Sequence, residues 1–262
     1  LDPNHPTVTV IAEIGDGGIK AKKVAKLCPS IDILGVNSYG GLASLPTRLR
    51  VADWNKPYMV TEFGTNGTWE VGKTAWGAPL EPSSTEKGRE YAARYASGIA
   101  SQKEWCVGSY VFLWGEKVEG TPTWFGMFLP GTGEKLGTVD AMATAWRGSP
   151  PPHLVPQIVR VASSAASKEI APGSRQTVAL SATGSSPLSV RYEIRPEMTD
   201  HGNHEPGQKA GAAIAGIVPP EGAPGGEQAF TAPRATGAYR LYLTVRDKDG
   251  GAATANLPFF VK

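Results

Sequence analysis

The sequence is poor in cysteine and histidine and carries no excess of charge of either sign. Its 262 residues include two cysteines and four histidines, too few for a disulfide framework or for a zinc site with definite ligand spacing. The 26 basic and 24 acidic residues leave a formal net charge of +2, which indicates neither a nucleic-acid-binding surface nor an acidic tail. No apolar run approaches the roughly 18 residues of a membrane helix. We therefore expect no metal, no cofactor, no nucleic acid and no membrane partner.

The two cysteines, Cys28 and Cys106, each come just before a predicted strand. We expect both to be free and buried thiols, at the end of the sheet opposite the strand ends described next. No signal peptide is visible, so the sequence leaves the compartment unknown.

Three short apolar segments each end in polar and aromatic residues. They read LGVNSYGG at 34–41, KPYMVTEFG at 56–64 and GSYVFLWGEK at 108–117. A strand that is apolar nearly all round is typical of a parallel sheet covered on both faces, and such sheets place their chemistry at the carboxyl ends of the strands. Glu62 stands at such an end and is the first candidate for a catalytic residue.

The residues at these strand ends suit a sugar. An aromatic ring stacks on the apolar face of a pyranose, and amide and carboxylate groups bind its hydroxyls. A loop expected at 65–82 is long enough to be functional and adds two more tryptophans. The candidate substrate-binding residues are Asn37, Tyr39, Trp69, Trp76, Trp114 and Glu116.

The ordered set of three strand ends resembles strands six, seven and eight of retaining glycoside hydrolases with a (β/α)8 barrel, and is most similar to glycoside hydrolase family 2. The resemblance implies that Glu62 is the nucleophile, that Tyr39 is the aromatic residue after strand six, and that Trp114 is a platform for the sugar. It covers roughly residues 1–148, where we count a strand and a helix four times over. The expected fold is therefore a half barrel, strands five to eight, acting on a β-linked oligosaccharide or polysaccharide.

One departure from the family pattern concerns the acid/base residue. The family carries it in an Asn-Glu pair at the end of strand four, and this sequence contains no Asn-Glu dipeptide. A retaining glycosidase needs a second carboxylate about 5 to 5.5 Å from the nucleophile. Glu13 and Glu116 are the candidates, with a structural role favoured for Glu13 and a sugar-binding role for Glu116.

Two other interpretations stay open. The chain could be a non-catalytic carbohydrate-binding or assembly module, or an inactive fragment of a longer glycosidase. A half barrel would also leave unpaired edges at 7–14 and 109–113, which predicts a homodimer. In such a dimer, Glu116 of one chain would face Glu62 of the other. A polysaccharide substrate favours a secreted or periplasmic protein.

The second part of the chain has a different pattern. The proline-rich segment 149–154 indicates a stiff linker, and residues 155–262 alternate like the strands of an antiparallel sandwich that folds alone. GAYRLYLTVRDKDGGAATANLPFFV at 237–261 resembles the last hairpin of an immunoglobulin-like or PKD-like module. We expect a hairpin turn at Asp247–Gly251 rather than a calcium loop, a long loop at 201–226, and His153 as a loop residue without a partner.

Overall fold

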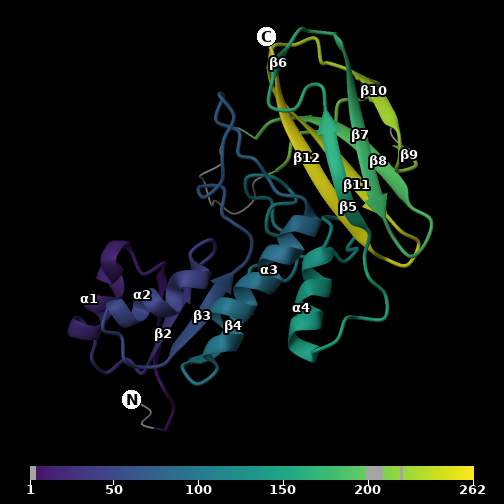
Figure 1. The fold of residues 1–262 in the computed structure, drawn as a ribbon. Coiled ribbons are helices and arrows are strands. Elements are labelled where there is room, and N and C mark those ends of the chain that lie inside the picture. Colours follow the sequence, from purple (N-terminus) through teal and green to yellow (C-terminus); the bar gives the residue numbers. More distant parts are fainter. Residues whose placement is uncertain (1–3, 199–208, 219–220) are drawn as a thin grey trace. The chain divides into compact units, whose positions relative to one another are not determined.

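The computed structural model describes residues 4–198, 209–218 and 221–262, and these form two compact units (Figure 1). The first unit consists of Leu1–Gly67 and Glu90–Leu113, and the second of Thr68–Arg89 and Trp114–Lys262. The boundary expected at residue 148 lies inside the second unit. None of the helices in the described part of the chain is long and apolar enough to cross a membrane.

The first unit is built on a parallel sheet whose four strands lie side by side in chain order, β1-β2-β3-β4. Each strand is followed along the chain by a helix, as the sequence predicted. The elements are β1 (Val8–Ala12), η1 (Asp16–Gly18), α1 (Ile19–Leu27), β2 (Ile33–Asn37), η2 (Leu42–Ser44), α2 (Leu45–Val51), β3 (Tyr58–Phe63), α3 (Ser84–Gly98), η3 (Ala100–Gln102), β4 (Cys106–Val111) and α4 (Gly137–Arg147). The first residues of α3 and all of α4 belong to the second unit.

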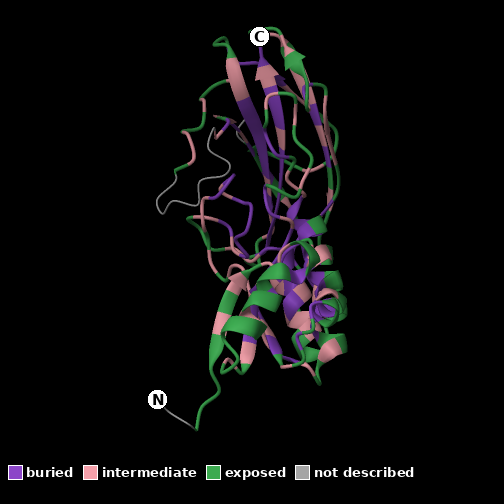
Figure 2. Cartoon of the chain, turned by 90° about the vertical axis from the view of Figure 1, so that its left-hand side faces the viewer, coloured by how far each residue is buried: buried purple, intermediate pink, exposed green. Residues whose placement is uncertain are grey.

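The two faces of this sheet differ in burial. Apolar side chains of β2 and β3, together with those of α2, form the core of the unit. Val10 of β1 shares the other face with Gly35 and is 51% exposed, and no residue of β1 is buried (Figure 2). The fully buried core side chains include Leu34, Val36, Leu45, Leu49, Tyr58 and Val60.

Two details of the first unit differ from the sequence prediction. The first strand ends at Ala12 because Glu13 has a positive φ of 51°, which an extended strand does not tolerate. Both cysteines are free, as expected, but Cys28 is exposed and Cys106 alone is buried. Cys28 lies at the exposed C-cap of α1, so its thiol points to solvent.

The second unit contains two sheets of sandwich type around one hydrophobic core. A three-stranded sheet has the order β10-β7-β5 and a five-stranded sheet the order β6-β12-β11-β8-β9. The sequence predicts strands at 176–181, 189–194, 239–246 and 253–261, which lie within β7, β8, β11 and β12, and it missed β5, β6, β9 and β10. The strands are β5 (Gln157–Ser163), β6 (Glu169–Ile170), β7 (Arg175–Thr183), β8 (Ser189–Pro196), β9 (Glu221–Gly222), β10 (Glu227–Thr231), β11 (Gly237–Arg246) and β12 (Ala252–Val261).

The hairpin of β11 and β12 is the centre of the larger sheet. Its two strands pair without interruption from Gly237↔Val261 to Arg246↔Ala252, and the turn lies at Asp247–Gly251 as predicted. Leu241, Leu243 and Val245 point into the core. The loop expected at 201–226 lies partly outside the described residues, and its described part includes the short strand β9.

Polar residues on the other face of the hairpin bind the chain segments 68–89 and 114–135. Arg240 is fully buried and donates to Glu197 (2.9 Å), Asn256 (2.6 Å) and the carbonyl of Pro79 (2.9 Å). Asn256 in turn donates to Glu81 over 2.5 Å. The loops predicted to serve the barrel half therefore pack on the sandwich.

Hydrogen bonds also fix the start of α3 and the end of the proline-rich segment 149–154. Ser83 and Glu86 form the predicted capping box at the start of α3, with the Ser83 N–H 2.8 Å from Glu86 Oε2 and the Glu86 N–H 3.3 Å from Ser83 Oγ. After the proline-rich segment, the Val155 N–H donates to Asp140 of α4 over 2.7 Å. The segment 149–154 is thus anchored at its far end.

Candidate functional site

Glu62 is the carboxylate at the carboxyl end of β3, and a buried tyrosine holds it. The hydroxyl of Tyr39 donates to Glu62 Oε2 over 2.7 Å. Tyr39 is only 8% exposed, and its ring packs edge-on against Phe112 with the centroids 6.0 Å apart. Glu62 Oε1 has no hydrogen-bond partner among the described residues. One carboxylate oxygen is therefore oriented by the protein and the other is available.

Asn37 lies beside Glu62 at the end of the neighbouring strand. The two residues are paired across β2 and β3 just after a register shift. The Thr61 hydroxyl donates to Asn37 Oδ1 over 2.7 Å, which assigns the carbonyl side of the amide. The Asn37 NH2 group has no partner in the described part of the chain, so it can donate to a ligand hydroxyl next to Glu62.

Helix α3 fixes the loop that follows Glu62. Arg94 donates to the carbonyl of Gly64 over 2.5 Å and also to the Asn66 side chain. Glu90 pairs with Arg94 one turn away, at 3.3 Å, and accepts from the Thr65 hydroxyl over 2.6 Å. This ion pair was not predicted from the sequence, although its i,i+4 spacing is typical of pairs that stabilise a helix.

Gly64 leaves no room for a side chain. A Cβ atom there would lie 2.8 Å from the Tyr91 hydroxyl oxygen and 2.8 Å from the Phe112 carbonyl oxygen. These two atoms are themselves joined by a 2.6 Å hydrogen bond that Tyr91 donates. The glycine after Glu62-Phe63 is therefore required by the close approach of α3 and the end of β4.

Glu13, a candidate second carboxylate, is held by other protein groups. Arg48 donates to its Oε2 over 2.6 Å and to its Oε1 over 3.3 Å. The Ser38 hydroxyl also donates to Oε1, and Arg48 reaches the Gly41 carbonyl at 2.8 Å. Both oxygens of Glu13 are thus occupied, and its contacts favour the structural role that the sequence analysis preferred.

Trp114 and Glu116 belong to the second unit. Trp114 is 60% exposed, and its ring is edge-on to Phe128 with the centroids 5.0 Å apart. Glu116 Oε2 accepts the Gly131 N–H over 2.5 Å, so this carboxylate holds the loop around Gly131. A role of either residue at the Glu62 site stays a prediction.

The two loop tryptophans also lie in the second unit. The Trp76 ring contacts Phe260 of β12 with the centroids 5.8 Å apart, and its indole N–H is buried without a partner among the described residues. This contact fixes the loop on the sandwich. Trp69 is exposed, and its glycan-binding role remains a prediction.

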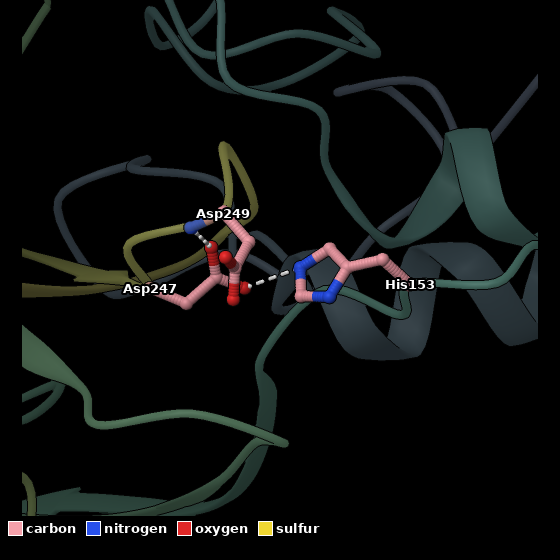
Figure 3. Close-up of side chains that lie close together, drawn as sticks. All are labelled: His153, Asp247 and Asp249. Carbon is pink, nitrogen blue, oxygen red and sulfur yellow. Dashed lines mark hydrogen bonds and ion pairs between the residues drawn. The ribbon is translucent and has the colours of Figure 1, made fainter.

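His153 and two aspartates of the hairpin turn, Asp247 and Asp249, carry side-chain atoms that can bind a metal ion (Figure 3). Their ligand atoms lie within 4.8 Å of one another. However, Asp247 Oδ1 accepts the N–H groups of Asp249 (2.9 Å) and Gly251 (2.8 Å), and its Oδ2 is 2.9 Å from His153 Nε2. The arrangement joins the segment before β5 to the hairpin, which corrects the expectation that His153 has no partner.

Hydrogen bonding controls the protonation of Asp247. Burial alone would raise the pKa of this carboxyl group, but the N–H groups of Gly251 and Asp249 and the nearby His153 outweigh it. The pKa of Asp247 is therefore held below its usual range. The carboxylate stays ionised and keeps the turn closed.

Comparisons with known proteins show no family and only weak structural likeness. No family model matches the chain, and no curated protein matches its sequence. A β-glucuronidase from Bacteroides uniformis is 11% identical with a TM-score of 0.34, and the match covers 100% of this chain and 32% of that chain. This chain therefore spans about a third of the length of that enzyme.

Two small β domains match part of the chain. The PKD domain of an M14-like peptidase from a Thermoplasmatales archaeon is 14% identical with a TM-score of 0.24, and the match covers 38% of this chain and 91% of that domain. CopC from Methylosinus trichosporium is 18% identical with a TM-score of 0.24, and the match covers 40% of this chain and 91% of CopC. At these scores the likenesses decide neither the fold nor the function.

Proposed function

We propose that the first unit carries the nucleophile side of a retaining glycosidase site, with Glu62 as the nucleophile. The observation that carries the proposal is the hydrogen bond from the buried Tyr39 to Glu62 at the carboxyl end of a parallel sheet. Parallel sheets built from strand–helix units place their chemistry at this end. The substrate class is a β-linked oligosaccharide or polysaccharide.

The order of the elements supports a half (β/α)8 barrel. Four parallel strands follow one another in the sheet in chain order, and a helix follows each strand along the chain. This is the repeating unit of a barrel, and it differs from a doubly wound sheet, whose strand order reverses at a switch point. In the half-barrel interpretation, β1 to β4 correspond to strands five to eight.

In the proposed reaction, Glu62 Oε1 attacks the anomeric carbon of the bound sugar. The new bond joins this oxygen to the anomeric carbon as the bond to the leaving oxygen breaks, and water later hydrolyses the ester. Tyr39 orients the carboxylate through Oε2, and Asn37 donates its free N–H groups to a sugar hydroxyl. Orientation by fixed donors lowers the barrier because no reorganisation is needed during attack.

The leaving group of a natural glycoside also needs a proton. Glu13 is occupied by Arg48 and Ser38, so we assign the acid/base role to no carboxylate of the first unit. Glu116 of a second copy is the proposed source. A substrate with a good leaving group departs without protonation and therefore tests Glu62 alone.

A covalent label tests the nucleophile. A 2-fluoro glycoside with a dinitrophenolate leaving group forms a long-lived ester with a retaining nucleophile, which peptide mass spectrometry locates. We expect the adduct on Glu62, none in Glu62→Gln, and an unchanged adduct in Glu104→Gln, an exposed glutamate of the same unit. Absence of an adduct with gluco, galacto and manno probes would overturn the proposal and favour a non-catalytic carbohydrate-binding module.

A further inference from the structure

The second unit contains a cleft that the Glu62 chemistry does not use. It has a volume of about 360 Å³ and lies between the segment 118–132 and the outer face of β8 and β11. This volume is at the lower end of the range of small-ligand sites, which starts at about 300 Å³. The residues that carry the argument are Arg191, Arg195, Arg246, Tyr242, Thr244 and Glu193.

The charged side chains of the cleft come from one face of the larger sheet. The pairing of β8 with β11 sets Arg191 opposite Thr244 and Glu193 opposite Tyr242. Directly paired residues point to the same side of a sheet, so all of them face the segment 118–132. Three guanidinium groups and one carboxylate line the cleft, and its lining is therefore net positive.

Internal ion pairs fix the arginines without using all their donors. Glu193 binds Arg191 at 2.8 Å and Arg195 at 3.3 Å, and Arg246 uses its Nε for Glu134 at 2.8 Å. Each guanidinium has five N–H donors. Arg191 Nε and Nη1 and both Nη groups of Arg246 have no partner among the described residues. The donors that remain can bind the oxygen atoms of an acidic ligand.

Two hydroxyl groups of β11 add to the polar lining. Tyr242 is only 7% exposed, and burial raises the pKa of its hydroxyl, so the group stays neutral and can donate. Neither Tyr242 nor Thr244 has a side-chain hydrogen bond within the described residues. Both hydroxyl groups can therefore bind a ligand in the cleft.

The opposite wall of the cleft is anchored. Gly131, which lines the cleft, donates its N–H to Glu116 over 2.5 Å. Leu129, another lining residue, packs with Leu136 and with Ala252 of β12. The segment 118–132 is therefore held in place before a ligand binds, as a specific site requires.

We infer that this cleft binds an acidic sugar residue, a uronate whose carboxylate pairs with Arg191 and Arg246 and whose ring hydroxyls contact Tyr242 and Thr244. The carboxylate matches the remaining guanidinium donors, and the hydroxyls match the neutral side chains. This site does not involve Glu62, although Glu116, the proposed acid/base residue of a second copy, also anchors one wall of the cleft through Gly131. It would let the second unit hold an acidic glycan.

Isothermal titration with the full chain tests the inference. The ligands are galacturonate, glucuronate, glucose as the neutral comparator, and inorganic sulfate as a simple anion. We expect a uronate to bind at least about tenfold more tightly than glucose, since a charged hydrogen bond contributes roughly 1.5 to 3 kcal/mol. It should also bind more tightly than sulfate, which lacks the ring hydroxyls that contact Tyr242 and Thr244. Equal affinities for uronate and sulfate would mean that the cleft binds anions in general. Equal affinities for uronate and glucose would mean that the carboxylate contributes nothing to binding. Either result overturns the inference.

Variants of the lining residues test whether the uronate binds in this cleft. Arg191→Gln and Tyr242→Phe should each weaken uronate binding about tenfold, whereas Arg160→Gln, an exposed arginine on β5, should leave it unchanged. Glu62→Gln should also leave it unchanged, which separates this result from that of the labelling experiment. Thermal unfolding of each variant shows whether it is folded, and unchanged binding in folded Arg191→Gln overturns the inference.

Discussion

The hydroxyl of Tyr39 lies 2.7 Å from Oε2 of Glu62 and donates its hydrogen to that oxygen. The two residues come from the ends of different strands, 23 positions apart in the chain. Register between β2 and β3 brings them together, so the fold itself fixes the direction of the carboxylate.

Tyr39→Phe should therefore slow the labelling of Glu62 by the 2-fluoro glycoside. The hydroxyl orients the carboxylate for attack, and a misplacement of a reacting group by about 1 Å can cost about 10² in rate, while stability should fall by only about 1 kcal/mol. Tyr95→Phe, which removes a hydroxyl from α3 in the same unit, is the matched control. Equal labelling rates in Tyr39→Phe and wild type would assign Tyr39 to packing alone.

Arg240→Met should destabilise the second unit strongly. It would leave Glu197 buried without its guanidinium partner and the Pro79 carbonyl without a donor. Breaking one side of a buried pair costs about 3 to 5 kcal/mol. Urea unfolding followed by tryptophan fluorescence measures this, because Trp76 and Trp124 belong to the same unit.

The double variant Arg240→Met with Glu197→Gln provides the control for that prediction. It removes both charges, so it should recover part of the lost free energy. If Arg240→Met were as stable as wild type, the contact of segment 68–89 with Arg240 would contribute nothing to the stability of the sandwich. In that case residues 155–262 should also fold alone, as expected from the sequence.

The stability of the second unit should depend on pH through the ionisation of Asp247. Its pKa is lowered in the folded state, mainly because N–H donors of the turn outweigh the effect of burial. Its contribution to stability is therefore complete above the ordinary aspartate pKa of about 3.9 and is lost as the pH falls through the folded value. The difference in unfolding free energy between wild type and Asp247→Asn should be constant from pH 7 to about pH 5 and shrink below about pH 4. Asp249→Asn, at an exposed position of the same turn, should show no such shrinkage.

The open edges of the parallel sheet predict self-association. Val10 and Tyr110 are 51% and 62% exposed on the two edge strands, and parallel sheets are rarely left uncovered. We expect a homodimer in light scattering that Val10→Lys converts to a monomer. Glycosidase activity lost in both Glu62→Gln and Glu116→Gln, but partly restored on mixing them, would place the partner's Glu116 at the site. A strict monomer at high concentration contradicts this prediction.

Local patterns in the sequence predicted the elements well. The run of apolar residues before Glu62 gave β3, the Ser83 to Glu86 spacing gave the start of α3, and the Asp-Gly-Gly turn gave the β11–β12 hairpin. Each signal lies within a few neighbouring residues, where backbone propensity and capping act. The half barrel itself stays a proposal, because strand order alone does not establish closure.

The side-chain contacts could not be predicted in the same way. Arg240 binds the carbonyl of Pro79 across 161 positions, and His153 reaches Asp247 across 94. Such contacts depend on how the sheets pack, and a lone arginine or histidine carries no local signal of its partner. The same reason applies to the arginines of the cleft. Arg191 and Arg195 are four positions apart on β8, and only the pairing of β8 with β11 brings Arg246 to the same face of the sheet.

The uninterrupted pairing of β11 with β12 also determines how the second unit opens. Both strands lie inside the five-stranded sheet, with β8 on one side and β6 on the other, and their core residues are almost all buried. Their backbone amide hydrogens should exchange with deuterium only when the whole unit unfolds, whereas those of β1, without a buried residue, should exchange through local fraying. The exchange rates of these slowest amides would then report the free energy of global unfolding of the second unit.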